Sequence, residues 1–209
     1  MNDKSDQPDR HLEGEGRASH RFNPERAEEF RDTERMDALE LNQLAAELEL
    51  APGQTVLDLG TGSGALLPWL SDQLKTGGVV IGSDISDDML SLSREYVQSN
   101  ALSNVVLIRN QATQTPLVTN TVDRVLIISS LHEFSHPFEM LNDAARVLVS
   151  GGRIGIMEWR YEETEPGPPL DHRLPPDRIH SWLKNAGLSR INRREWHRGY
   201  DLFTASLNK

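Results

Sequence analysis

Three glycines at alternate positions follow a short apolar segment and form the clearest candidate for a ligand-binding loop. The stretch reads Asp58-Leu59-Gly60-Thr61-Gly62-Ser63-Gly64 and lies between a predicted strand and the helix after it. Glycine lets the backbone pass close under a ligand, because a Cβ atom there would collide with it. The helix that follows points free N–H groups and a partial positive charge at the same place. The sequence therefore predicts a ligand site at the end of the first strand.

A carboxylate at the end of the second predicted strand is the next part of this site. Asp84 closes that strand. In open α/β sheets, ligands bind outside the carboxyl ends of the strands, at the point where the strand order reverses. A carboxylate there can accept two hydrogen bonds from a ribose diol. The structural alternative is an ordinary acid at a helix start, but Ser86, Asp87 and Asp88 already fill that role.

The order of the predicted elements places both features on one parallel sheet. Apolar periodicity predicts a helix over 34–50 and, after it, strands over 56–59, 79–82, 105–108, 122–128 and 153–159. Helices are expected between these strands and again from 175 to 187, and residues 150–152 break the helix before the fifth strand. Segments 188–196 and 200–207 predict an antiparallel hairpin. The pattern predicts a doubly wound, mostly parallel, seven-stranded α/β sheet with helices on both faces.

Length and composition limit the domain organisation and the partners. The chain has 209 residues, which suits one α/β domain. We expect a flexible polar tail over residues 1–19 and a single domain over residues 20–209. The net charge of −10 disfavours nucleic-acid binding. The sequence shows neither a signal peptide nor an apolar run long enough to span a membrane, which predicts a soluble, cytoplasmic monomer or homodimer.

The absence of cysteine excludes several kinds of chemistry. Without cysteine there are no disulfides, no thiolate zinc sites and no thiol nucleophiles. We also expect no metal, because Asp123, Glu133 and Glu139 do not form a convincing cluster of acids.

The glycine pattern alone also fits the dinucleotide-binding fingerprint, with Ala65 in its final small position. Three features favour another family: Asp58 lies inside the first strand, a helix precedes that strand, and the chain ends in a hairpin without a substrate domain. These features resemble class I S-adenosylmethionine (SAM)-dependent methyltransferases. The similarity extends from about residue 22 to residue 207 and is strongest to the ubiquinone/menaquinone-biosynthesis subgroup and to a group of small prokaryotic methyltransferases. It is carried by residues 20–22, 56–64, 80–86, 121–134, 144–159 and 167–169.

This resemblance implies a Rossmann-like class I methyltransferase fold, with SAM as cofactor and S-adenosylhomocysteine as product. It implies that Asp58 and the glycines hold the methionine part of SAM, that Asp84 binds the ribose, and that hydrophobic side chains flank the adenine. The implied cofactor-binding residues are Asp58, Gly60, Thr61, Gly62, Gly64, Asp84, Ile85, Met89, Gln111, Ala112, Leu131 and Phe22. Gln111 and Ala112 depart from the family pattern, which usually has an acid there that binds the adenine amino group. A glutamine oxygen can accept the same bond without charge.

The candidates for catalysis and acceptor binding follow the fourth and fifth strands. Methyl transfer mainly requires alignment of the acceptor and exclusion of water, with removal of a proton where the acceptor carries one. His132, beside Glu133, is the candidate base, and a packing role for His132 stays open. The candidates for substrate contact are Trp159, His172 and Tyr200; simple packing or a solvated loop is the alternative for each.

Three functions compete at this point. The first is a methyltransferase acting on a small molecule, the second is a non-catalytic SAM-binding regulatory protein with the same fold, and the third is a nicotinamide-dependent oxidoreductase. Methylation of a protein or a tRNA is a further alternative. The sequence does not identify the methyl acceptor.

Overall fold

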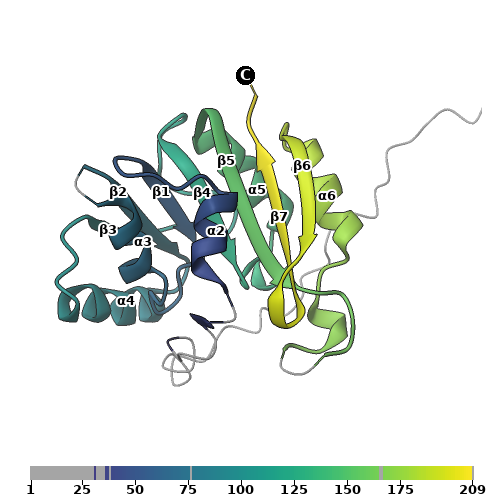
Figure 1. Cartoon of the computed structure of the whole chain (residues 1–209), viewed down its shortest axis with the longest axis horizontal. Helices are drawn as coiled ribbons and strands as arrows, with labels where there is room; N and C mark the ends of the chain where they lie inside the picture. Colours follow the sequence, from purple (N-terminus) through teal and green to yellow (C-terminus); the bar gives the residue numbers. More distant parts are fainter. Residues whose placement is uncertain (1–30, 32–35, 38, 76, 165–166, 209) are drawn as a thin grey trace, which may run out of the picture.

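A computed structural model describes residues 31, 36–37, 39–75, 77–164 and 167–208. The predicted tail over 1–19 and the predicted cofactor-binding residue Phe22 lie outside these residues. The centre of the molecule is one seven-stranded sheet with the order β3-β2-β1-β4-β5-β7-β6 (Figure 1). The strands are β1 (Thr55–Leu59), β2 (Val79–Asp84), β3 (Val105–Arg109), β4 (Val122–Ile128), β5 (Leu148–Trp159), β6 (Ser189–Glu195) and β7 (Tyr200–Ser206).

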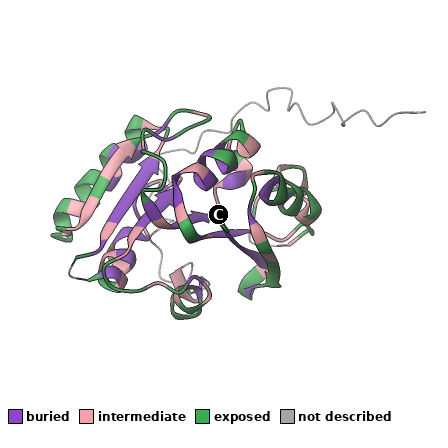
Figure 2. Cartoon of the chain, turned by 90° about the horizontal axis from the view of Figure 1, so that it is seen from above, coloured by how far each residue is buried: buried purple, intermediate pink, exposed green. Residues whose placement is uncertain are grey.

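Helices cover both faces of the sheet (Figure 1). Two separate apolar clusters hold these layers together, one on each face. The first face carries α2 (Leu41–Glu47), α3 (Leu67–Leu74) and α4 (Asp87–Ser99), and the second carries α5 (Pro137–Val147) and α6 (Pro176–Asn185). Figure 2 shows that buried positions gather on the strands and on the helix sides turned toward them. The predicted α/β architecture is therefore confirmed.

Strand burial agrees with the layered arrangement. In β4 every residue except Asp123 is buried, as expected for a central strand that helices cover on both faces. β7 is also buried throughout, whereas the outer strand β6 is mostly exposed. Strands β1, β2, β3, β4 and β5 are parallel, and β7 runs antiparallel to both β5 and β6. The predicted terminal hairpin is therefore present.

Two predicted boundaries were wrong. The helix expected over 34–50 has its regular part only in α2, because Glu40 adopts a left-handed conformation (φ 44°) immediately before it. The break expected at 150–152 does not separate a helix from a strand. Instead, β5 begins at Leu148 and runs through both glycines, and its register against β4 shifts between Val122 and Arg124. A bulge of this kind accommodates extra residues without ending the strand.

The strand order creates the position of the site. β1 pairs with β2 on one side and with β4 on the other, and all three are parallel. The strands before β4 lie on one side of β1 and the later strands lie on the other side, so the strand order reverses between β1 and β4. The loops that leave β1 and β4 therefore diverge. The glycine loop, Asp84 and the segment after β4 meet at this edge.

Candidate functional site

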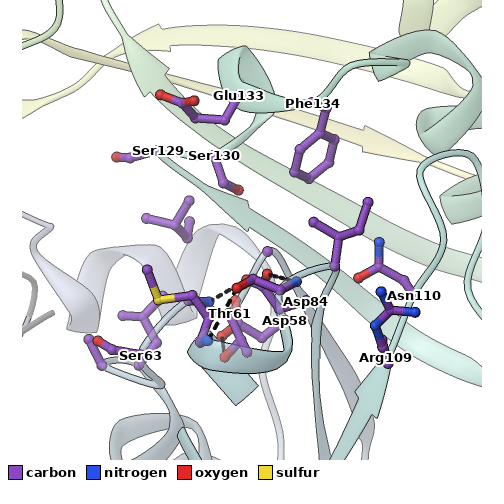
Figure 3. A pocket seen from close by; sticks show the side chains of 18 of the residues that line it. Asp58, Thr61, Ser63, Asp84, Arg109, Asn110, Ser129, Ser130, Glu133 and Phe134 are labelled. Carbon is purple, nitrogen blue, oxygen red and sulfur yellow. Dashed lines mark hydrogen bonds between the residues drawn. The ribbon is translucent and has the colours of Figure 1, made fainter. Parts of the chain in front are cut away.

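A cavity of about 1060 Å³ lies at the carboxyl ends of β1, β2 and β4 (Figure 3). Its lining combines the glycine loop, the start of α4, the end of β3 and the segment after β4. The residues with side chains of direct interest are Asp58, Thr61, Asp84, Ile85, Met89, Arg109, Asn110, Ala112, Ser129, Ser130, Glu133 and Phe134. A volume of this order suits a nucleoside-sized ligand together with a small second molecule.

The glycines of the loop have different physical roles. All three have positive φ angles, of 81° at Gly60, 55° at Gly62 and 83° at Gly64. A Cβ atom at Gly60 would lie 2.6 Å from Oγ of Ser130, so this glycine is required by packing across the cavity. A Cβ atom at Gly64 would lie 2.9 Å from a Leu67 methyl group. Gly62 faces open space and lines the cavity, so it is the glycine that a ligand can approach.

Asp58 is a buried carboxylate at the floor of the cavity. Its side chain accepts a 2.7 Å hydrogen bond from the Thr61 hydroxyl. Burial raises the pKa of Asp58 to about 6; the Thr61 hydrogen bond acts in the opposite direction, and the charge of Asp84 adds to the rise. No cationic side chain contributes to this shift. The site therefore holds a buried negative charge that a cationic ligand group would stabilise.

Asp84 connects the two loops that form the floor of the cavity. One carboxylate oxygen accepts the N–H of Gly62 and the other accepts the N–H of Ser86, both at 2.9 Å (Figure 3). Burial raises the pKa of Asp84, while these N–H groups and that of Ile85 lower it. Ser86 in turn caps α4, since its hydroxyl accepts the N–H of Met89. The three N–H groups bound by Asp84 leave one of the four lone pairs of the carboxylate free, so Asp84 can still accept a hydrogen bond from a ribose hydroxyl.

Three of the four residues predicted to surround the adenine line the cavity, and Gln111 does not. Ile85, Met89 and Ala112 line the cavity, and Ile85 is 50% exposed. Gln111 is exposed and is not among the lining residues, whereas its neighbour Asn110 is. Asn110 accepts a hydrogen bond from the Ser83 hydroxyl and donates one to the Gln111 carbonyl. Sequence reasoning missed Asn110, although a polar residue directly after a strand was an available signal.

Gly64 and Leu131 also lie outside the cavity lining. Leu131 is fully buried in the core on the α5 and α6 face of the sheet. The Cβ position of Gly64 faces Leu67 and Ser93. Gly64 therefore affects the cavity only indirectly, because its positive φ angle sets the conformation of the loop.

His132 lies between two carboxylates. Its Nδ1 is 2.7 Å from Glu158, its backbone N–H donates to the same carboxyl group, and its Nε2 is 3.4 Å from Glu133. Burial alone would lower the pKa of His132, but the charges and hydrogen bonds of Glu158 and Glu133 raise it to about 10. The ring is therefore an imidazolium at neutral pH and has no lone pair with which to act as a base. Glu133, and not His132, lines the cavity.

The three residues predicted to contact substrate are not among the residues that line this cavity. Tyr200 is 2% exposed, and its ring lies 4.2 Å from that of Trp159. His172 lies in a short 3₁₀ turn, η4 (Leu170–His172). The adjacent Arg173 is buried, lies over the Trp159 ring, and donates hydrogen bonds to the carbonyls of Arg160, Glu162, Thr164 and Pro168. These contacts fix the loop after β5 and assign Arg173 a structural role.

Arg31 is a contact to the glycine loop that sequence reasoning missed. Its guanidinium donates hydrogen bonds to the carbonyls of Ser63, at 2.7 Å, and Leu92, at 3.2 Å. The same group stacks on the Tyr96 ring, with 3.9 Å to the ring centre. Arg31 therefore joins the loop after β1 to helix α4. No local pattern signals this contact, because the partners are distant in sequence.

Comparisons with known proteins agree with this geometry. Residues 56–152 match the family model described as a methyltransferase domain. The chain is 35% identical over 115 residues to the ubiquinone/menaquinone biosynthesis C-methyltransferase UbiE of Salmonella arizonae, a match that covers 54% of this chain and 46% of that protein. The chain thus spans about half the length of the curated relatives it matches.

Solved structures extend the similarity over most of the chain. A SAM-dependent methyltransferase from Aquifex aeolicus superposes with a TM-score of 0.84 at 29% identity, covering 89% of this chain and 99% of that one. The fold also matches phosphoethanolamine N-methyltransferase 2 of Haemonchus contortus, crystallised with SAM, with a TM-score of 0.69 at 15% identity over 82% of this chain and 52% of that one. The chain thus has the fold of SAM-dependent methyltransferases, and residues 56–152 are similar to their methyltransferase domain. Within the described residues, no helix has the length and apolar character needed to cross a membrane.

Proposed function

We propose that the protein transfers the methyl group of SAM to a small-molecule acceptor in the cavity at the carboxyl ends of β1, β2 and β4. The observation that carries this proposal is the pair of buried carboxylates, Asp58 and Asp84, beside a glycine that leaves open space. Burial raises the pKa of both carboxyl groups. A ligand with a positive charge and a diol would stabilise both in their ionised forms. SAM has both groups, so the residues fit this cofactor.

Each part of the loop has a defined task in this proposal. SAM supplies a methyl group on a sulfonium, which is already a good leaving group. Gly62 lets the backbone approach the cofactor, and Asp84 binds the ribose while it holds Gly62 and Ser86 in place. Asp58, oriented by Thr61, faces the positively charged methionine end. The protein then contributes alignment and exclusion of water more than chemical activation.

The similarity to UbiE supports a finer proposal on the acceptor. That protein is named as a C-methyltransferase of ubiquinone and menaquinone biosynthesis. The acceptor side of the present cavity includes the apolar side chains of Ile128, Phe134 and Met140. These contacts favour a small-molecule acceptor with an apolar or aromatic body.

Calorimetric titration with SAM, S-adenosylhomocysteine and NAD tests the cofactor. We expect binding of the first two and none of NAD; binding of NAD without any response to SAM would overturn the proposal.

A matched pair of loop variants sharpens the test. Gly62→Ala should weaken SAM binding, because its Cβ takes up open space on the loop that lines the cavity, and should destabilise the protein less than Gly60→Ala, whose Cβ meets Ser130. Methyl release on a panel of metabolites then distinguishes an enzyme from a non-catalytic SAM-binding protein.

A further inference from the structure

The side of the cavity opposite the glycine loop carries polar groups that cofactor binding does not use. Ser129, Ser130 and Glu133 follow β4 and lie across the cavity from Asp58 (Figure 3). The Ser130 hydroxyl donates to the Leu59 carbonyl at 3.3 Å. The Oγ atom of Ser129 is buried and has no hydrogen-bond partner among the described residues. An unpaired buried hydroxyl in a cavity indicates a place where a ligand group completes the hydrogen bonding.

The backbone fixes Ser129 in this position. Its φ angle is 51°, in the left-handed region that non-glycine residues seldom adopt. Its N–H donates a 2.7 Å hydrogen bond to the Met157 carbonyl of β5, which holds the segment against the neighbouring strand. Rigid structure and not a mobile loop therefore holds Ser129 at the cavity lining.

The charge on this side is negative. One imidazolium, His132, faces two carboxylates, and its shorter contact is to Glu158, which is 2% exposed. Glu133 takes the longer contact of 3.4 Å and keeps 38% of its side chain exposed. The cluster of three residues thus carries one uncompensated negative charge at the cavity. A pKa of about 10 for His132 supports this count, because the imidazole is protonated already at neutral pH.

The described lining offers no free cation to an acidic acceptor. Arg109 is the cationic side chain among the lining residues of the described part of the chain, and its Nε lies 3.0 Å from Asp87. A carboxylate or phosphate placed beside Glu133 would meet a like charge without a counter-charge from the described lining residues. Like charges at short range disfavour binding and act as a filter against the wrong ligand.

We propose that Ser129 and Glu133 form the acceptor subsite, which takes an uncharged or cationic acceptor bearing an O–H or N–H group and excludes carboxylates and phosphates. This inference rests on the proposed methyl transfer. The O–H or N–H group of the acceptor donates a hydrogen bond to Glu133, and an uncharged acceptor atom also accepts one from Ser129. During transfer the bond between the methyl carbon and sulfur breaks, its electron pair moves to sulfur, and the acceptor's own electron pair forms the new bond to the methyl group. The acceptor's proton moves to Glu133.

His132 is a positioning residue in this scheme. It is protonated and held by Glu158, so it does not receive the acceptor's proton. It orients the Glu133 carboxylate through the contact at 3.4 Å. Glu158, which is buried against the same ring, fixes the imidazolium in turn.

Three probes with the same ring and different charges test the subsite. Benzylammonium, benzyl alcohol and benzoate are titrated into the complex with S-adenosylhomocysteine, and the amide signals of Ser129 and Glu133 are followed by NMR. We expect both signals to shift with benzylammonium and benzyl alcohol, with benzoate binding at least about fivefold more weakly than benzylammonium. Equal or tighter binding of benzoate, or no shift with any probe, would overturn the assignment. Failure of S-adenosylhomocysteine to bind would count against the proposed function instead.

Variants identify the groups responsible. Glu133→Gln should remove the preference for benzylammonium over benzoate, and Ser129→Ala should weaken benzyl alcohol. Glu139→Gln, an exposed position on α5 outside the cavity lining, is the matched control and should keep the preference. His132→Gln should not lower the preference, because Glu133 keeps its charge and the positive charge of the imidazolium is removed. An unchanged preference in Glu133→Gln would assign the selectivity to another group.

Discussion

The buried carboxylates on the two sides of the cavity have different kinds of partner. On the cofactor side, Asp58 and Asp84 are held by a hydroxyl and by backbone N–H groups, with no cationic side chain as a partner. On the acceptor side, His132 and Glu158 form a buried ion pair within the protein. The carboxylates on the cofactor side lack a positive partner that a cationic ligand can supply, whereas Glu158 already has one in His132. The difference predicts that changes on the cofactor side affect binding, and that changes to the buried ion pair affect stability.

The largest effect is expected on the acceptor side, from Glu158→Gln. Removal of one partner of a buried ion pair costs about 3–5 kcal/mol of the free energy of unfolding. Denaturant unfolding at pH 7 measures this loss, and Glu95→Gln, at an exposed position of α4, is the control.

The raised pKa of His132 adds a pH dependence to the stability. Because the folded state holds the proton more tightly, stability should fall as the pH rises from about 7 toward 10, and Glu158→Gln should flatten this slope. A loss below about 1 kcal/mol would show that the pair is not a stabilising unit.

The next effect is expected on the cofactor side, from Asp84→Ala. Loss of charge-assisted hydrogen bonds to the ribose should weaken SAM by about 2–4 kcal/mol. Calorimetry gives the affinity, and denaturant unfolding of the same variant gives its stability. Asp88→Asn, on the same cavity edge but outside the proposed hydrogen bonds, is the matched control. Unchanged affinity in Asp84→Ala would remove this residue from the proposed ribose site.

A smaller effect is expected from pH on SAM binding. The pKa of Asp58 is raised to about 6, and a cationic cofactor favours its ionised form, so the carboxyl group must release its proton on binding below that pH. The affinity for SAM should therefore fall by up to about tenfold for each pH unit below 6. Asp58→Asn should bind more weakly at pH 7.5 and respond less to pH, with Asp84 contributing what remains. A flat profile in the unmodified protein would contradict a charge interaction between Asp58 and the cofactor.

The smallest effect is expected from Arg31→Ala. This change removes two hydrogen bonds to carbonyls and one stacking contact on Tyr96, each worth about 1 kcal/mol in a partly buried setting. Because Arg31 holds the Ser63 carbonyl, we expect SAM to bind about fivefold more weakly. Tyr96→Phe keeps the stacking surface and should bind SAM normally. Normal affinity in Arg31→Ala would show that the loop keeps its conformation without this contact.

Local patterns in the sequence were sufficient for the fold and for the floor of the site. Alternating apolar and turn segments predicted the parallel strands and the hairpin, because strand and helix periods are properties of consecutive residues. The glycine loop and Asp84 were predicted for the same reason, since each directly follows a strand. The exceptions are also local. Glu40 adopts a left-handed conformation, and a bulge carries β5 through the two glycines at 151 and 152.

Tertiary structure decided the roles of the remaining residues. His132 was predicted as a base, but Glu158 reaches it from the end of the next strand and keeps it protonated. Asn110 replaced Gln111 at the cavity, and Trp159 and Tyr200 pack against each other away from its lining. A side chain's pKa and the direction in which it points depend on neighbours that the fold brings from distant positions. The sequence by itself therefore determined which strand ends and loops surround the cavity, whereas only the three-dimensional packing determined which side chains line it.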